Sequence, residues 1–356
     1  MYTILFIETF LYVCGNSAIL LNNIHSIYGK STFLHFSEGL VHIVYIDYLK
    51  LAASYENNCA VDEITDDKLE SMFDKLEEQY GGYCFDEDYE KKVFNTWSVN
   101  DFFQSVVSNK FVYFGEYWYD NGGLPSILVN YLKTHELNIF EYLDKDKFLK
   151  VSSDDFKNPT ALTTINQNVL MCQTGYLTLR SDLNKTSTVA LGIPNGEIYK
   201  ALNRLLANNI FKGNTDITDD YGRSLLEVGT VDDIINLFNS ALNSVSYDNY
   251  PIVSESSVQN MLKLYLLGAH QKVLSEVHEA KGRADLVVNT DNRRIVFEFK
   301  YAKNETEAKS KLLDAVEQIK TRDYGNIVPK KTELLRIATV FNADPKVRAF
   351  TEFQLV

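Results

Sequence analysis

The segment Gly282–Ala302, Gly-Arg-Ala-Asp-Leu-Val-Val-Asn-Thr-Asp-Asn-Arg-Arg-Ile-Val-Phe-Glu-Phe-Lys-Tyr-Ala, predicts two β-strands joined by a turn. The strands are the apolar runs Ala284 to Val288 and Ile295 to Ala302, and the polar residues Asn289 to Asn292 between them suit a hairpin. Such a hairpin places Asp285 beside Glu298.

The second strand carries two charges in an otherwise apolar run. Because side chains alternate along a strand, Glu298 and Lys300 share one face and the aromatic residues occupy the other. Burying these charges is costly unless they are paired.

Two carboxylates beside a lysine suit Mg²⁺ or Mn²⁺, since such ions prefer oxygen ligands. The pattern favours metal-assisted hydrolysis of a phosphodiester bond, with Lys300 positioning the nucleophile or a phosphate oxygen. The alternative is a structural Glu298–Lys300 pair, with Asp285 only starting a strand.

Flanking patterns extend the hairpin into one compact α/β (α+β) unit. Apolar residues recur at helical spacing before and after it, and Ser254 is suited to capping the first helix, with Glu255 at its start. The expected elements are a helix over residues 256–270, a strand over 273–277, a helix over 305–324 and a strand over 334–341. With the hairpin, the order is α-β-β-β-α-β.

This order, with an aspartate followed by Glu-X-Lys, resembles the core of the PD-(D/E)XK superfamily of restriction-endonuclease-like nucleases. Gly-Arg-Ala-Asp-Leu-Val-Val and Phe-Glu-Phe-Lys are also similar to the C-terminal domain of bacterial proteins that pair an AAA-ATPase-like N-terminal region with such a nuclease. Upstream motifs resemble the linking region of the same proteins, and they lie at residues 80–85, 93–99, 117–118, 123–128, 175–179 and 193–198. The similarity covers about residues 60–356.

The resemblance implies a role for each matching charged residue. Asp285 and Glu298 correspond to metal ligands, and Lys300 corresponds to the catalytic lysine. Glu255 corresponds to an additional acidic residue and third ligand, although an acidic residue in a first helical turn is also favoured by the helix dipole.

Three further residues are candidates around the same site. Gln318 matches the glutamine that some superfamily members place on the helix after the Glu-X-Lys strand, and the alternative is an ordinary exposed helical glutamine. Arg283 is a candidate ligand for a backbone phosphate, unless it only caps the hairpin. Lys303 is a second candidate for phosphate.

The chain departs from these relatives at its N-terminus, where residues 1–60 leave room for only a truncated AAA-ATPase-like remnant. Tyr28-Gly29-Lys30-Ser31-Thr32 is similar to a phosphate-binding loop, but Ile24 stands where that pattern needs glycine. Val44-Tyr45-Ile46-Asp47 resembles a Walker B strand, yet it follows after only about fifteen residues. We therefore do not expect the protein to bind ATP.

The remaining chain divides into two expected parts. Residues 61–250 read as a mostly helical linking region with a small hairpin near 175–179 and 189–193, and residues 251–356 form the nuclease-like domain. The polar segment Asn243 to Pro251 is the expected boundary.

Charge distribution bears on the partner. The 356-residue chain carries a net charge of −13, which opposes binding to nucleic acid. Residues 251–356, however, hold 17 Lys and Arg against 14 Asp and Glu, or +3, so the preceding 250 residues carry −16. We expect a metal-dependent nuclease that cuts DNA in preference to RNA. The alternative is a catalytically inactive nuclease fold that serves as a binding or scaffold protein.

Cysteine content and hydropathy indicate the compartment. Four cysteines without paired metal spacing favour reduced thiols in a cytoplasmic protein. The apolar stretch Met1 to Leu21 lacks a basic start and contains Glu8, so we expect a buried segment and no membrane association. A protein partner or a homodimer is compatible with these patterns.

Overall fold

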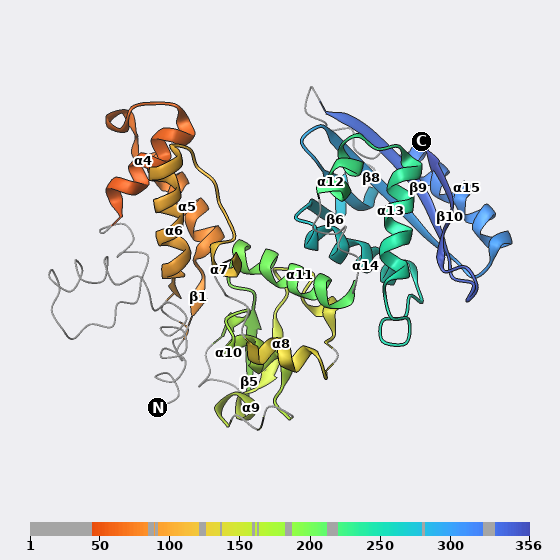
Figure 1. The fold of residues 1–356 in the computed structure, drawn as a ribbon, viewed down its shortest axis with the longest axis horizontal. Helices are drawn as coiled ribbons and strands as arrows, with labels where there is room; N and C mark the ends of the chain where they lie inside the picture. Colours follow the sequence, from red (N-terminus) through yellow and green to blue (C-terminus); the bar gives the residue numbers. More distant parts are fainter. Residues whose placement is uncertain are drawn as a thin grey trace. The chain divides into compact units, whose positions relative to one another are not determined.

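The computed structural model of the protein describes residues 45–84, 89, 92–120, 126–135, 137–158, 161, 164–181, 187–211, 220–279, 282–322 and 332–356 (Figure 1). Two compact units divide the chain, Met1–Ala201 and Leu202–Val356. The apolar stretch at residues 1–21 and the loop-like segment Tyr28 to Thr32 lie outside the described residues. In the part of the chain that the structure describes, every helix is too short or too polar to span a bilayer.

The first unit is mostly helical. Its helices are α4 (Ile46–Asn57), α5 (Asp66–Tyr80), α6 (Thr96–Asn109), α7 (Tyr117–Asp120), α8 (Ser126–Leu132), α9 (Ser153–Lys157) and α10 (Gln167–Gln173), with short 3-10 helices η1 (Val61–Glu63) and η2 (Ile139–Glu141) and the start of α11 (Gly196–Ile210). A core of buried apolar and aromatic side chains joins α4, α5 and α6; it includes Leu49, Met72, Leu76, Phe102 and Phe103.

For the described residues Tyr45 to Asp47, the interpretation as a Walker B strand is wrong. Ile46 and Asp47 form the first turn of α4, because Leu49, Ala52 and Ala53 recur at helical spacing and are fully buried.

Two small sheets complete the first unit. One pairs β1 (Tyr83–Cys84) with β2 (Lys92–Val93), and the other has the order β3-β5-β4, from β3 (Leu149–Ser152), β4 (Thr178–Leu179) and β5 (Thr188–Gly192). The expected pairing of β4 with β5 is present and antiparallel, and β3 adds a third strand.

Several motifs of the linking region meet at a buried polar junction. The Asn195 side chain donates to the Gly81 carbonyl at 2.8 Å. Glu197, which is 0% exposed, accepts the Ser98 hydroxyl at 2.6 Å and the Trp118 backbone N–H at 2.8 Å. Burial raises the pKa of Glu197 to about 7, although both hydrogen bonds oppose the shift. The motifs thus have a structural role in the first unit.

The second unit contains a five-stranded sheet with helices on both faces (Figure 1). Its elements are α12 (Asp220–Val228), α13 (Val231–Asn243), α14 (Glu255–Gly268), β6 (Lys272–Glu279), β7 (Gly282–Asn289), β8 (Arg293–Ala302), α15 (Glu305–Arg322), β9 (Glu333–Asn342) and β10 (Ala349–Leu355). The strand order is β10-β9-β8-β7-β6, antiparallel except for the β8–β9 pair, which is parallel because α15 crosses between the two strands. The predicted α-β-β-β-α-β order is confirmed, with β10 added.

Alternation along β8 separates the two faces of this sheet. Val296 packs with Ala315 and Ile319 of α15. Phe297, on the opposite face, lies against Phe238 of α13 with ring centroids 5.3 Å apart. Glu298 and Lys300 follow Val296 at two-residue steps and therefore share the α15 face.

Helix α13 belongs to the second unit although it precedes the expected boundary. The Asn239 side chain accepts the Phe350 backbone N–H at 2.7 Å and donates to the Phe350 carbonyl at 3.1 Å. These bonds fix α13 to β10, so the compact unit begins well before the segment Asn243 to Pro251.

Candidate active site

The candidate site begins where the ladder between β7 and β8 stops. The two strands pair from Asn289 and Arg294 as far as Leu286 and Phe297, and the next pair would be Asp285 and Glu298. At this point a side chain replaces a backbone carbonyl as the acceptor between the strands: the Asp285 Oδ2 accepts the Phe299 backbone N–H at 2.9 Å. The sequence-predicted placement of Asp285 beside the Glu298 strand is confirmed.

Glu298 lies at the centre of the site and is 0% exposed. Its Oε1 accepts the Lys300 ammonium at 2.7 Å. Its Oε2 is buried and has no hydrogen-bond partner among the described residues, an arrangement that is costly for a carboxylate and rare in proteins. Burial, followed by repulsion from Asp285, raises the pKa of Glu298 to about 7.

The other two charges share this environment. Burial also raises the pKa of Asp285, although the Phe299 N–H and the Lys300 charge oppose the shift. For Lys300, burial lowers the pKa, but the bond to Glu298 and the nearby carboxylates raise it more, so the net shift is upward. Lys300 therefore remains a cation, and the two carboxylates beside it exceed its charge.

Helix α14 brings Glu255 to the same place. Ser254 caps this helix by accepting the Ser257 backbone N–H at 3.2 Å, as predicted. The Glu255 carboxylate then lies 3.5 Å from the Lys300 ammonium, and its side chain is 44% exposed. The structure thus brings Glu255 into contact with Lys300.

Gln259 is a site residue that the sequence reasoning missed. Its side-chain amide donates to the backbone carbonyl of Asp285, which holds α14 against β7 at the metal-ligand candidate. The available signal was position, because Gln259 follows Glu255 by four residues and therefore shares its face of α14.

The remaining candidates lie around this cluster. Arg283 is exposed on β7, and its charge opposes the upward pKa shift of Asp285. Lys303 is exposed just beyond β8, where its backbone N–H donates to Glu307 at 2.8 Å. Gln318 is half-buried on α15 beside Ile319. The roles of Arg283, Lys303 and Gln318 stay predictions.

The donor set suits a hard divalent cation. Asp285 and Glu298 offer carboxylate oxygens. The buried Oε2 of Glu298, which has no hydrogen-bond partner among the described residues, is suited to binding a metal ion. No group of three His, Cys, Asp or Glu side chains forms a metal-binding cluster within the described ranges. Two residues therefore fit the metal, and a third ligand from Glu255 stays a prediction.

Comparison with protein families identifies residues 253–351 as a PD-(D/E)XK nuclease superfamily domain. The match starts just before α14 and ends within β10, so it includes Asp285, Glu298 and Lys300. No curated protein and no protein of solved structure matches the chain. The resemblance to the superfamily is confirmed for this segment, whereas no match supports an AAA-ATPase-like region in residues 1–60.

Proposed function

We propose that the protein is a metal-dependent nuclease that hydrolyses phosphodiester bonds, in DNA in preference to RNA. One observation carries the proposal. Asp285, Glu298 and Lys300 meet where β7 and β8 separate, inside the segment that matches the nuclease superfamily. A carboxylate pair that exceeds the charge of its lysine suits a cation and a phosphate together.

Asp285 and Glu298 would hold Mg²⁺ or Mn²⁺. When bound, such an ion activates water and neutralises charge on the phosphate. The protein contributes the positions: the Phe299 N–H and the Gln259 amide fix Asp285, and Glu298 holds the Lys300 ammonium at 2.7 Å. From there Lys300 can orient the attacking water or a phosphate oxygen.

Charge around the site supports a nucleic-acid substrate. Residues 251–356 carry +3 while the rest of the chain carries −16, so the positive charge is concentrated in the matching domain. Arg283 near the start of β7 and Lys303 just beyond the end of β8 are both exposed at the same end of the antiparallel β7–β8 pair, and they are suited to phosphate contacts.

A second candidate is a nuclease fold that binds nucleic acid or protein without cleaving. The observation that favours it is the ion-pair network, because Lys300 is already neutralised by Glu298 and Glu255. In that case the three charges would serve the structure and no metal would bind.

Calorimetric titration with Mg²⁺ and Mn²⁺ separates the two candidates. The parent should bind metal and cleave DNA, and an Asp285→Asn/Glu298→Gln variant should do neither. The matched control is Asp291→Asn/Asp314→Asn, which removes two exposed carboxylates of the same unit and should behave as the parent. A folded parent that binds no metal would refute the nuclease. Single- and double-stranded DNA and RNA are compared in the cleavage step.

A further inference from the structure

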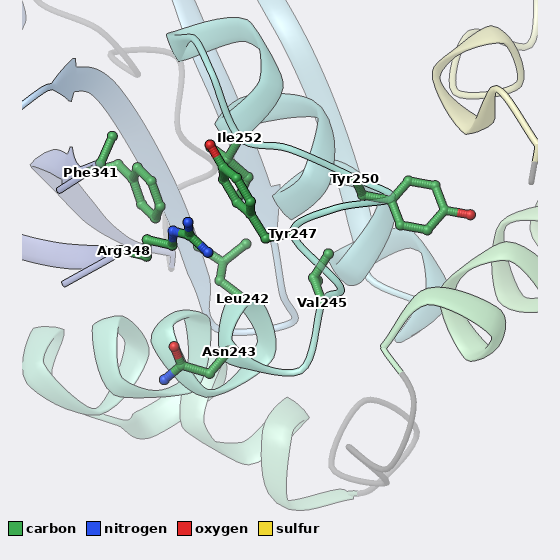
Figure 2. Close-up of a pocket in the computed structure, with 9 residues that line it drawn as sticks. Leu242, Asn243, Val245, Tyr247, Tyr250, Ile252, Phe341 and Arg348 are labelled. Carbon is green, nitrogen blue, oxygen red and sulfur yellow. The ribbon is translucent and has the colours of Figure 1, made fainter. Parts of the chain in front are cut away.

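A cavity of about 180 Å³ lies in the second unit, outside the carboxylate cluster. Its walls come from the end of α13, the segment that leads to α14, and the strand ends at Phe341 and Arg348 (Figure 2). Aromatic and aliphatic side chains form most of the wall, including Leu242, Tyr247 and Ile252. The cavity thus combines apolar walls with one cation.

That cation has an unused donor. The Arg348 guanidinium lies 3.4 Å from the centre of the Tyr247 ring, and Figure 2 shows the two groups side by side. Stacking on the ring leaves the N–H groups at the guanidinium edge available. The Nε of Arg348 is buried and has no hydrogen-bond partner among the described residues. A ligand in the cavity that accepts hydrogen bonds would therefore meet its donors at the terminal N–H groups of the guanidinium.

Two connections place the cavity next to the candidate site. Tyr301 directly follows Lys300, and its ring stacks on the cavity residue Phe341 with centroids 6.4 Å apart. On the other side, Ile252 precedes Glu255 by three residues, a chain length of at most about 10 Å, and Glu255 contacts Lys300. Because side chains alternate along β8, Lys300 and Tyr301 lie on opposite faces of the sheet, so a ligand that contacts both must pass the nearby end of β8 at Ala302.

We propose that this cavity receives one unstacked base of a nucleic acid whose backbone passes Lys300, an inference that rests on the proposed nuclease function. Proteins recognise splayed bases by stacking them on aromatic rings and bonding their edges, and Arg is the most frequent donor to base acceptors. A cavity of about 150 Å³ holds a benzene ring, so 180 Å³ suits a single pyrimidine ring.

The lining favours a base over a free phosphate. A phosphate placed among Leu242, Ile252 and Phe341 would lose its hydration and gain only one cationic partner. A pyrimidine ring would bury apolar faces and offer carbonyl oxygens to the Arg348 edge. The substrate would then be single-stranded at this position, or would have one base displaced from its pair.

The test is to measure binding of DNA to the protein without metal, so that the strand is not cleaved during the measurement. The probe is a fluorescent single-stranded DNA of about ten pyrimidine nucleotides, compared with a series in which one base at a time is removed to leave an abasic site. Removing the base that enters the cavity should weaken binding to the parent about tenfold. Tyr247→Ala and Arg348→Lys should weaken binding of the intact strand by a similar factor. The strand that is abasic at that position should bind to either variant as tightly as it binds to the parent.

The control is Arg223→Lys, the same change at an exposed arginine of α12. It should bind every strand as the parent does, and thermal unfolding should show that all variants are folded. Equal weakening of intact and abasic strands by Arg348→Lys would show a phosphate contact and overturn the inference. Abasic strands that all bind like the intact strand would overturn it as well.

The two proposals fail in different ways. If the protein cleaves nucleic acid but Tyr247→Ala weakens binding of the intact strand and of every abasic strand equally, the nuclease proposal holds and the base-site proposal is refuted. A base-dependent response without metal binding or cleavage removes the nuclease and keeps the base site. A parent that binds none of these strands removes the base site, and the metal titration and the cleavage assay then decide the nuclease separately.

Discussion

Replacing Lys300 with methionine should destabilise the second unit strongly. Lys300 is the closest cation to the Glu298 carboxylate, at 2.7 Å, and their side chains are 16% and 0% exposed. Removing one partner of a buried ion pair leaves the other charge without compensation and costs about 3–5 kcal/mol. The partial exposure of Lys300 admits some solvent, and Glu298, whose pKa is already about 7, can take up a proton when Lys300 is absent, so we expect a loss below this range, about 2 kcal/mol.

A second variant isolates the charge from the packing. Glu298→Gln/Lys300→Met removes both charges with little change in volume, and replacing a whole buried pair is often neutral or stabilising. We expect the double variant to recover most of the lost stability while staying inactive. The control is Lys309→Met. Its partner Glu305 lies at 2.6 Å, but the Lys309 side chain is 62% exposed, so this variant should be as stable as the parent.

Hydrogen exchange of peptides from β8 and β9 is the suitable assay. Both tryptophans, Trp97 and Trp118, lie in the first unit, so their fluorescence does not report on the second. A loss below about 1 kcal/mol in Lys300→Met would show that solvent screens the pair and would refute the burial argument. A double variant as unstable as the single one would show that Glu298 and Lys300 serve stability, as the scaffold hypothesis requires.

Three other predictions concern packing and protonation. The pKa of Glu197 is about 7 in the folded protein, against an ordinary value of 4.5, so the folded state binds the proton more tightly than the unfolded state does. The free energy of unfolding of the first unit should therefore fall by about 3 kcal/mol as the pH rises from 4.5 to above 7. Glu197→Gln should abolish that slope in urea unfolding followed by tryptophan fluorescence, and a slope that persists would contradict this assignment. Asn239→Ala removes two hydrogen bonds to the Phe350 backbone and should cost about 2 kcal/mol, seen as exchange in β10 that is faster than in the parent while exchange in β7 changes less; exchange in β10 at the parent's rate would show that α13 does not hold β10. Ser254→Ala removes the cap of α14 and should cost about 1 kcal/mol, with faster exchange in the first turn, whereas unchanged exchange would mean that the cap is dispensable.

Local pattern was sufficient to predict the core of the second unit and its central charges. Alternation from Ile295 to Ala302 separates Glu298 and Lys300 from the aromatic face, and the polar turn fixes the register of the hairpin. Asp285 was therefore placed correctly without any knowledge of distant contacts.

What the sequence did not reveal depends on long-range contacts or broken periodicity. A bulge between Phe350 and Glu352 interrupts the alternation of β10, so that strand was not predicted. The attachment of α13 rests on bonds between Asn239 and Phe350, which lie 111 residues apart. The cavity beside Arg348 is likewise assembled from separate segments.

The two edges of the five-stranded sheet bear on how the protein behaves when concentrated. Among the strands that the structure describes, β6 and β10 are the two outermost, and an open edge invites pairing with the edge of another copy. The bulge in β10 bends one edge away from straight pairing, and exposed Lys272 at the start of β6 places a charge on the other. Sheet extension between copies should therefore be suppressed, and light scattering should show no growth of particles at high protein concentration.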